Sequence, residues 1–590
     1  MRRIRAALVV LLVFALSACV NEPVQPPGQP VPTPRPEPTR LVVGVDELPA
    51  GFNPHLLAHL GPVTTALATL VLPSVFRPDE NGVPRLDTTI ATSAEVVATE
   101  PFTVSYELNL EAAWSSNAPI AAEDFVYLWQ RMRAEPGVAD AAGYQLITDV
   151  RSRAGGKAVD VVFAHPYPAW QELFGNLLPA HLLKDAPGSW VGATTGGLPA
   201  SGGPFRIITV DRARGLVELA RNDLYWDTPA VLDTLVLRRS GDVETVAGLA
   251  SGDVDIALRE ADEGIRTALV GLQPAPHTQT APQPVVVQLG MRGDGGPLAD
   301  PRARQGLAAL IDREAVRAGV SPDALAADAF GLAPSEPGYR PTAPPGAPAR
   351  PDPVVAGRLL VQAGWSRDLA TGHWAIAGTP VRLVLGAAAG RADDLEVARL
   401  VADQLDQAGI DVTVIAPSGE DLFGTVAVPA TPPSSTEPPG TTAPPRGLTP
   451  TPTPTPTAPT GTAVAAPATV EPDLLIVPRT VGADPGTELA SDYGCPTPAE
   501  SVPVPPRSPT GFCFAALQPA LDALVSPSPR PDAIAEVEQV LWQQLPALPL
   551  FQPVTLVVST AAADAATGIG PGPLRTGPVT GAESWRAPNG

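Results

Sequence analysis

The sequence predicts an α/β fold built from more than one domain. Three stretches carry the prediction: residues 41–49 form an apolar strand entering a turn, residues 101–110 alternate as a strand, and residues 537–558 indicate a helix followed by a strand. The chain has 590 residues, of which 44% are hydrophobic, so a sizeable core is possible despite 74 prolines.

The strand at residues 101–110 is predicted from its alternation. In "PFTVSYELNL" every second side chain is apolar, and side chains two positions apart point to the same face of a sheet. The face predicted to be buried comprises Phe102, Val104, Tyr106, Leu108 and Leu110.

A helix is predicted directly after this strand, within "WSSNAPIAAEDFVYLWQRM" at residues 114–132. Pro119 and the acidic pair Glu123–Asp124 lie early in the predicted helix, where proline is tolerated and negative charge suits the helix dipole. An apolar stripe follows at helical spacing and comprises Phe125, Leu128, Trp129 and Met132. We therefore expect this stretch to be a structural unit whose side chains pack into a core.

Residues 1–19 have the pattern of a secretory signal peptide. Three arginines precede an apolar run from Ala6 to Leu16 that is too short to span a bilayer. The run ends in Leu-Ser-Ala-Cys, which resembles the bacterial lipobox, so Cys19 is predicted to receive lipid; the alternative is an ordinary signal with a chance cysteine. Residues 20–40 are rich in proline and would form an extended tether. The mature protein would then be lipid-anchored at the extracytoplasmic face of the cell membrane.

The two remaining cysteines are predicted to form a disulfide. Cys495 and Cys513 flank a stretch rich in Pro and Ser, and leftover cysteine pairs outside the cytoplasm are usually oxidised. The alternative is two free thiols. Their spacing is not that of a metal site.

A second low-complexity tract occupies residues 430–470 and is rich in Pro and Thr. It has no apolar period, so it is predicted to be disordered. Such an insertion is tolerated within a folded body when its ends emerge close together, because closure entropy grows slowly with length.

Charge and motifs argue against nucleic-acid binding and catalysis. The formal net charge of −22 repels nucleic acid and anionic membrane surfaces. His55 and His59 have a spacing that could hold zinc, but they lack a third ligand, so a helix surface is the favoured interpretation. The acidic pairs Glu123–Asp124 and Asp253–Asp255 are typical of solvated faces or caps. The sequence therefore predicts no catalytic residue, no metal and no cofactor.

A series of motifs runs in one order through residues 41–560. Its clearest members are "EAAWSSNAPIAAEDFVYLWQRM", "SGGPFRIITVDRARGLVELARNDLYW", "LDTLVLRRSGDVETVAGLASGDVDIAL", "PLADPRARQGLAALIDREAV" and "LPALPLFQP". Together they resemble the family 5 extracellular solute-binding proteins of ABC importers, which bind peptides or nickel. Phe205 stands where that family usually has tyrosine.

The resemblance implies a two-lobed periplasmic-binding-protein type II fold with an extra small subdomain. Ligand is trapped in the cleft when the lobes close about a hinge of crossing strands. Lobe I would comprise residues 41–75, 196–280 and 546–590, the subdomain 76–195, and lobe II 281–545 with the Pro/Thr-rich tract inside it. The implied protein is a monomer that binds a peptide-like or other polar solute and presents it to an ABC permease.

One departure bears on the ligand. Peptide-binding members hold the peptide's amino group with an aspartate near a Gly-Trp segment in lobe II. The corresponding stretch here is "LLIVPRTVGADPG", which lacks the tryptophan and leaves Asp484 as the candidate for that charge. Peptide and nickel specificity are therefore not implied.

Further stretches, among them "GFNPHLL", "LPAHLLKD" and "YGCP", resemble an actinobacterial branch of the family. That branch includes a lipoprotein linked to phosphatidylinositol mannoside and lipoarabinomannan assembly. The alternative function is therefore a non-transporting envelope lipoprotein that binds a glycolipid intermediate or a partner protein and regulates that assembly.

Overall fold

The computed structural model describes residues 38–346, 350–424, 471–496, 508–528, 530 and 532–588. The chain divides into the units Met1–Pro38 and Thr39–Gly590, and the helices and strands lie in the second. Predictions for Cys19, for the tether up to residue 37 and for the tract 430–470 lie outside the described residues. Within those residues no helix has the length and apolar character needed to cross a membrane.

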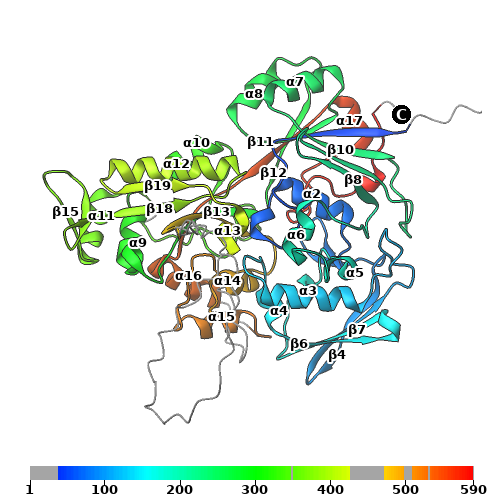
Figure 1. Ribbon diagram of the computed structural model, residues 1–590, viewed down its shortest axis with the longest axis horizontal. Coiled ribbons are helices and arrows are strands. Elements are labelled where there is room, and N and C mark those ends of the chain that lie inside the picture. The colour runs from blue at the N-terminus through cyan, green and yellow to red at the C-terminus, as the bar shows by residue number, and fades with distance from the viewer. Residues whose placement is uncertain are drawn as a thin grey trace, which may run out of the picture. The chain divides into compact units, whose positions relative to one another are not determined.

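The first large sheet combines the first strand of the chain, the last strand and the strands of residues 205–282 (Figure 1). Its seven strands lie in the order β12 (His277–Pro282), β22 (Val554–Ser559), β11 (Ile256–Glu260), β1 (Arg40–Val45), β10 (Thr234–Arg239), β9 (Leu216–Arg221) and β8 (Phe205–Asp211). The central strand β1 is buried along Leu41–Val45, as its apolar sequence predicts. It pairs in parallel with β10 and β11. Helices α7 (Asp242–Ser251) and α8 (Glu263–Val270) pack on this sheet through a separate apolar cluster.

The second large sheet is formed by the middle of the chain and one late strand. Its six strands lie in the order β14 (Leu325–Ala326), β21 (Ala547–Gln552), β13 (Val285–Met291), β20 (Leu474–Thr480), β18 (Arg382–Gly386) and β19 (Asp411–Ile415). The helices along this part of the chain are α9 (Pro301–Ala308), α10 (Arg313–Val320), α11 (Pro353–Gln362), α12 (Ala392–Gln407), α13 (Gly419–Gly424), α14 (Pro485–Tyr493), α15 (Gln518–Leu524) and α16 (Ala533–Gln544). A small sheet of β15 (Trp365–Arg367), β16 (Trp374–Ile376) and β17 (Thr379–Pro380) lies beside α11.

The chain crosses between the two large sheets twice. It passes from β12 to β13 through Gln283 and Pro284, and from β21 to β22 through Pro553. The Gln283 backbone N–H donates to the Pro553 carbonyl at 2.9 Å, so the two crossings are bonded to each other. The prediction placed residues 546–590 in lobe I, whereas β21 belongs to the second sheet because it pairs with β13 and β14.

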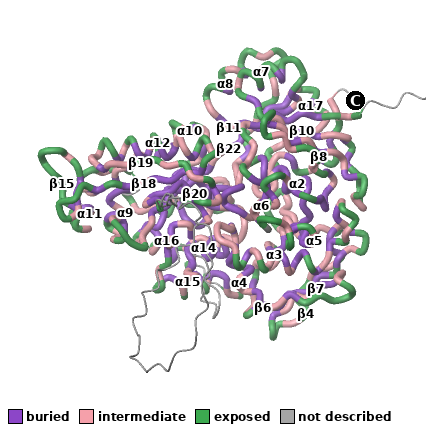
Figure 2. Tube along the Cα trace, viewed as in Figure 1, coloured by how far each residue is buried: buried purple, intermediate pink, exposed green. Residues whose placement is uncertain are grey.

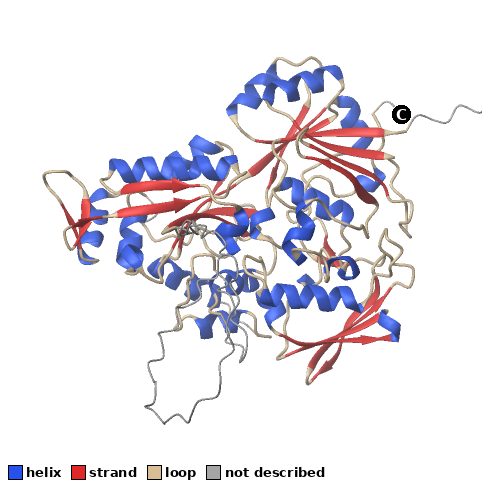
Figure 3. Cartoon of the chain, in the orientation of Figure 1, coloured by secondary structure: helices blue, strands red, loops and turns tan. Residues whose placement is uncertain are grey.

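A four-stranded antiparallel sheet occupies the stretch predicted as the subdomain (Figure 3). Its order is β4 (Ala91–Thr99), β5 (Phe102–Leu108), β7 (Ala158–Phe163) and β6 (Ile147–Arg153), and α3 (Ala122–Ala134) packs beside it. The prediction for Leu110 is wrong: β5 ends at Leu108, and Leu110 is 80% exposed. Pro119 also lies before the helix, because α3 begins at Ala122.

The remaining described elements are short. They are helices α2 (Pro62–Val71), α4 (Ala142–Gln145), α5 (Ala180–Leu183), α6 (Ser189–Thr195) and α17 (Ala561–Thr567), the hairpin β2 (Phe76–Pro78) and β3 (Pro84–Leu86), and the 3₁₀ turns η1 (Leu57–His59), η2 (Ala154–Gly156), η3 (Trp170–Glu172), η4 (Gly296–Leu298) and η5 (Ala582–Ser584). Buried residues run through both large sheets and along α3 (Figure 2). Of the predicted stripe, Phe125, Leu128 and Met132 are buried, and Trp129 packs half-buried against the same core.

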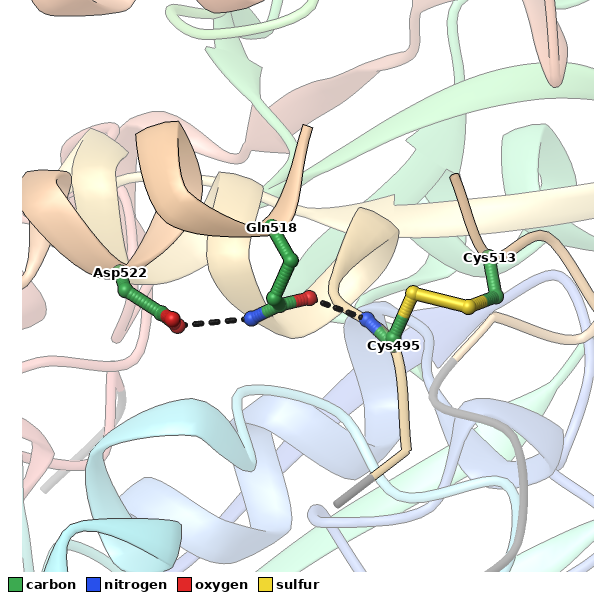
Figure 4. The surroundings of a disulfide bond; sticks show 4 residues. All are labelled: Cys495, Cys513, Gln518 and Asp522. Carbon is green, nitrogen blue, oxygen red and sulfur yellow. Dashed lines mark hydrogen bonds between the residues drawn. A yellow bond between two sulfur atoms is a disulfide. The ribbon is translucent and has the colours of Figure 1, made fainter. Parts of the chain in front are cut away.

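The predicted disulfide is confirmed. Cys495 and Cys513 are bonded, with a sequence separation of 18 residues. Gln518 of α15 fixes one side, because its Oε1 accepts from the Cys495 backbone N–H at 2.6 Å while its Nε2 donates to Asp522 at 2.7 Å (Figure 4).

Candidate ligand-binding cleft

A cavity of about 690 Å³ lies where the two large sheets meet. Its walls come from the ends of β1, β10 and β11 on one side and from the start of α12 on the other. Between these walls it is lined by residues of the two crossings and of the strands that adjoin them, namely Gln283, Val285, Val287, Phe551, Pro553 and Thr555. A cavity of this size and position is typical of a small-molecule site between lobes.

The lining is rich in carboxylates. Among the described residues, six acidic side chains and three arginines face it: Asp46, Glu47, Glu244, Glu260, Asp393 and Asp394, with Arg239, Arg259 and Arg391. Asp46 directly follows β1, Glu260 ends β11, and Asp393 lies in the first turn of α12. The ends of parallel strands and a helix N-terminus therefore bring these acids together from distant parts of the sequence.

Glu260 and Asp393 meet across the cavity through a side-chain hydrogen bond. Burial, that hydrogen bond and the nearby charge of Asp393 raise the pKa of Glu260 to about 10. Burial also raises the pKa of Asp46 to about 6, although Arg259 opposes the shift. Ionising both of two facing buried carboxylates costs free energy through their mutual repulsion, so the pair holds a proton at neutral pH.

Arg259 fixes the lobe I side of this cluster. Its Nη2 lies 2.8 Å from Asp46 Oδ1 and 2.7 Å from Asp242 Oδ1, and its Nη1 donates to the Ser240 carbonyl. Only 6% of the residue is exposed. This buried guanidinium is therefore neutralised by protein carboxylates and leaves the cavity with an acidic excess.

Polar contacts join the two lobes around the cavity. Arg391 Nη1 donates to the Leu60 carbonyl at 2.5 Å, and His59 Nε2 lies 3.0 Å from Glu420 Oε1 of α13. His59 and Leu60 belong to the stretch after β1, whereas Arg391 and Glu420 belong to the second lobe. The lobes are thus in contact along this edge.

A second, smaller cavity of about 140 Å³ continues the first. The two share the lining residues Leu60, Gly61, Thr64, Gln283 and Val285. The polar groups of the smaller cavity include Asp140, Glu172, Thr480 and Arg575. One cleft thus has a large acidic part and a small part that contains an ion-pair cluster.

Asp484, the predicted ligand-binding residue, acts as a helix cap. Its Oδ2 accepts from the backbone N–H and the hydroxyl of Thr487, each at 2.8 Å, at the start of α14. It is absent from the described linings of both cavities. A ligand role for Asp484 stays a prediction, and its carboxylate is already engaged in the helix cap.

The residues that make the cleft were missed by sequence reasoning. A signal did exist for Asp46, because it closes the predicted strand in "LVVGVD". Glu260 ends β11, for which no strand was predicted. Asp393 and Arg575 carried no comparable signal, since their partners lie more than a hundred residues away along the chain.

The histidine pair does not lie on a helix surface as expected. His59 is fully buried and its Nδ1 accepts from the Asn53 backbone N–H, whereas His55 contacts the Asn176 carbonyl through Nε2. Among the described residues no group of three or more His, Cys, Asp or Glu side chains is placed to hold a metal ion. Burial lowers the pKa of both histidines, to about 4 for His55.

Known proteins resemble this chain in sequence and in fold. Residues 86–430 match the family model described as bacterial extracellular solute-binding proteins, family 5 middle. The probable monoacyl phosphatidylinositol tetramannoside-binding protein LpqW of Mycobacterium tuberculosis (strain ATCC 25618 / H37Rv) is 35% identical over 94% of this chain and 93% of its own length.

Among solved structures, the oligopeptide-binding protein AppA from Bacillus subtilis, in complex with a nonapeptide, superposes with a TM-score of 0.69 at 16% identity and covers 93% of this chain and 100% of its own. The periplasmic EDTA-binding protein EppA gives a TM-score of 0.66 at 19% identity, over 93% of this chain and 96% of its own. These likenesses confirm the predicted two-lobed periplasmic-binding-protein type II fold.

Proposed function

Because the chain belongs to the family 5 extracellular solute-binding proteins, we propose that it is a lipid-anchored receptor of an ABC importer. It binds a peptide-like or other polar solute between its lobes and releases it unchanged. Cys19 carries the lipid, and the chain between Cys19 and Thr39 holds the folded part, which begins with β1 at Arg40, away from the membrane. The protein acts as a monomer without catalytic residues.

The observation that carries this proposal is the cavity of about 690 Å³ formed by both lobes over the two crossings. A ligand there contacts both halves at once, so binding favours the closed arrangement that a permease recognises. The Glu260–Asp393 contact across it supports a solute that supplies hydrogen-bond donors or positive charge, such as a peptide amino group.

A second candidate is a non-transporting envelope lipoprotein that binds a glycolipid intermediate. It is favoured by the 35% identity, over nearly the whole chain, to a protein named for binding a phosphatidylinositol mannoside. The acidic lining argues against it, because an anionic phosphate would meet carboxylates that already repel each other.

Native mass spectrometry of the protein purified from its own host tests the proposal. We expect a retained polar solute, and its occupancy should fall by about 10-fold in Asp393→Asn, which removes one partner of the cross-cavity pair. Asp403→Asn is the matched control, because Asp403 lies on the same helix but pairs with Arg399 at an exposed surface.

Equal solute occupancy in the two variants would contradict the cavity as the binding site. A retained mannosylated lipid would favour the second candidate. Conversion of the retained solute into a product would exclude a pure binding role.

A further inference from the structure

The segment after α17 leaves the first sheet and packs against the second lobe. Leu574 contacts an apolar cluster of Val286, Ala327, Ala333 and Val481. Gly482 permits this approach, because its φ is +95° and a Cβ there would lie 2.9 Å from Leu574 Cδ2. The C-terminal segment is thus held against Val481 and Gly482, which directly follow β20 and line the smaller cavity.

Arg575, the next residue, delivers a guanidinium into the small cavity. Its Nη2 lies 3.2 Å from Asp140 Oδ2 and its Nη1 lies 3.5 Å from Glu172 Oε2. Asp140 also accepts from the Thr480 hydroxyl of β20 at 2.7 Å. One chain of contacts therefore links the C-terminal segment, the predicted subdomain and the second lobe.

The cluster is accessible from the cleft. The side chain of Arg575 is 32% exposed and those of Asp140 and Glu172 are each 23% exposed, and all three line the small cavity. Without a cation between them, the two carboxylates would lie together at a half-buried site, which is unfavourable. The two carboxylates, the Thr480 hydroxyl and the lining shared with the larger cavity are features of a subsite for an ammonium or guanidinium group.

We infer that Arg575 is a built-in occupant of a cation subsite formed by Asp140, Glu172 and Thr480. It determines specificity, because it closes this end of the cleft and confines solute to the larger cavity. It also contributes to lobe closure, because it holds the Asp140 carboxylate that accepts from the Thr480 hydroxyl of the second lobe. The inference rests on the proposed function only in taking the cleft as the solute site.

Arg575→Ala with chemical rescue tests the inference. We expect a larger radius of gyration by small-angle X-ray scattering and a Tm lowered by about 2 °C, with both changes at least half reversed by millimolar methylguanidinium. Arg575→Lys should give an intermediate result, because an ammonium keeps the charge but cannot bridge two carboxylates in the same way.

Arg153→Ala is the matched control. Arg153 likewise bridges two carboxylates, 2.7 Å from Asp160 and 3.2 Å from Glu107, but on the four-stranded sheet away from the cleft. This variant should keep its radius of gyration and gain nothing from methylguanidinium. If Arg575→Ala fails to fold, Glu172→Gln, which leaves Arg575 in place but removes one of its two carboxylate partners, should by itself show a larger radius of gyration than the unmodified protein.

An unchanged radius of gyration in Arg575→Ala, or rescue by methylguanidinium no greater than in Arg153→Ala, would overturn the inference. The proposed function fails separately, through the absence of a retained solute in the unmodified protein. The two failures are therefore distinguishable.

Discussion

The buried side chain of Asp124 connects three parts of the chain through hydrogen bonds. It is 3% exposed, and its carboxylate accepts from the backbone N–H groups of Ala121 (3.0 Å) and Ala180 (2.9 Å) and from Trp114 Nε1 (3.2 Å). These bonds join the start of α3 to the preceding turn and to α5. The residue is a cap, as one of the predicted alternatives had it, and it is also a buried hub.

Asp124→Ala should destabilise the protein by about 2–3 kcal/mol, because it removes a cap and leaves buried donors without an acceptor. Glu123→Ala is the control: Glu123 is 54% exposed and pairs with Lys184 at the surface, so its loss should cost less than about 1 kcal/mol. Urea denaturation midpoints measure both. Equal losses would refute the hub role of Asp124.

At the scale of elements, local pattern predicted well and long-range pairing did not. Alternation predicted β5, and the 3.6-residue period predicted the buried stripe of α3, because both signals arise within one element. Leu110 was misplaced because alternation continues past the point where hydrogen bonding to β7 stops. The membership of β21 in the second sheet depends on pairing with β13, about 260 residues earlier, which no local signal reports.

The disulfide should stabilise the segment that it closes. Cys495→Ser with Cys513→Ser removes a cross-link over 18 residues, and on the chain-entropy model the loss is about 3 kcal/mol. We expect calorimetry to give a lower Tm for the double variant than for the unmodified protein. Adding a reductant to the unmodified protein should lower its Tm by a similar amount. A Tm insensitive to both treatments would show that the surrounding contacts, including the Gln518 bridge, suffice.

At the scale of the whole molecule, the Glu260–Asp393 pair couples stability to pH. The pKa of Glu260 is raised to about 10 from 4.5, so between these values the folded state binds more protons than the unfolded state. Stability then falls as pH rises, by on the order of 1 kcal/mol per pH unit. The buried histidines act in the opposite direction only below their ordinary pKa of 6.5. Burial also raises the pKa of Glu488 and, to about 7, that of Asp492, so both act in the same direction as Glu260 from pH 7 to 8.5. The contribution of the carboxyl pair is therefore the part of the pH dependence that a Glu260 variant removes.

Calorimetry from pH 7 to 8.5 should therefore show a falling Tm, and Glu260→Gln should make that slope shallower without abolishing it, because Glu488 and Asp492 remain. Glu244→Gln, which removes another carboxylate from the same cavity, should leave the slope unchanged. A slope in Glu260→Gln equal to that of the unmodified protein would assign the proton to a different group.

The two-lobed fold was predictable from the ordered motifs, and the ligand-facing residues were not. Motifs such as the Trp114 turn mark packing, and Trp114 is fully buried. The cleft depends on which strand ends converge, so Asp46, Glu260 and Asp393 acquire a role only in three dimensions. Asp484 illustrates the converse, since a position inferred from the family serves here as a helix cap.

The passages between the sheets make a stiff pivot. Pro282, Pro284 and Pro553 fix their own φ angles and restrict the residues before them, and the Gln283–Pro553 bond obliges both strands to turn together. We therefore expect the two lobes to rotate about a single hinge axis, with little twisting or sliding of one lobe against the other. On opening, the distance between the lobes should then increase most at the cleft entrance farthest from the three prolines, which is where a solute enters.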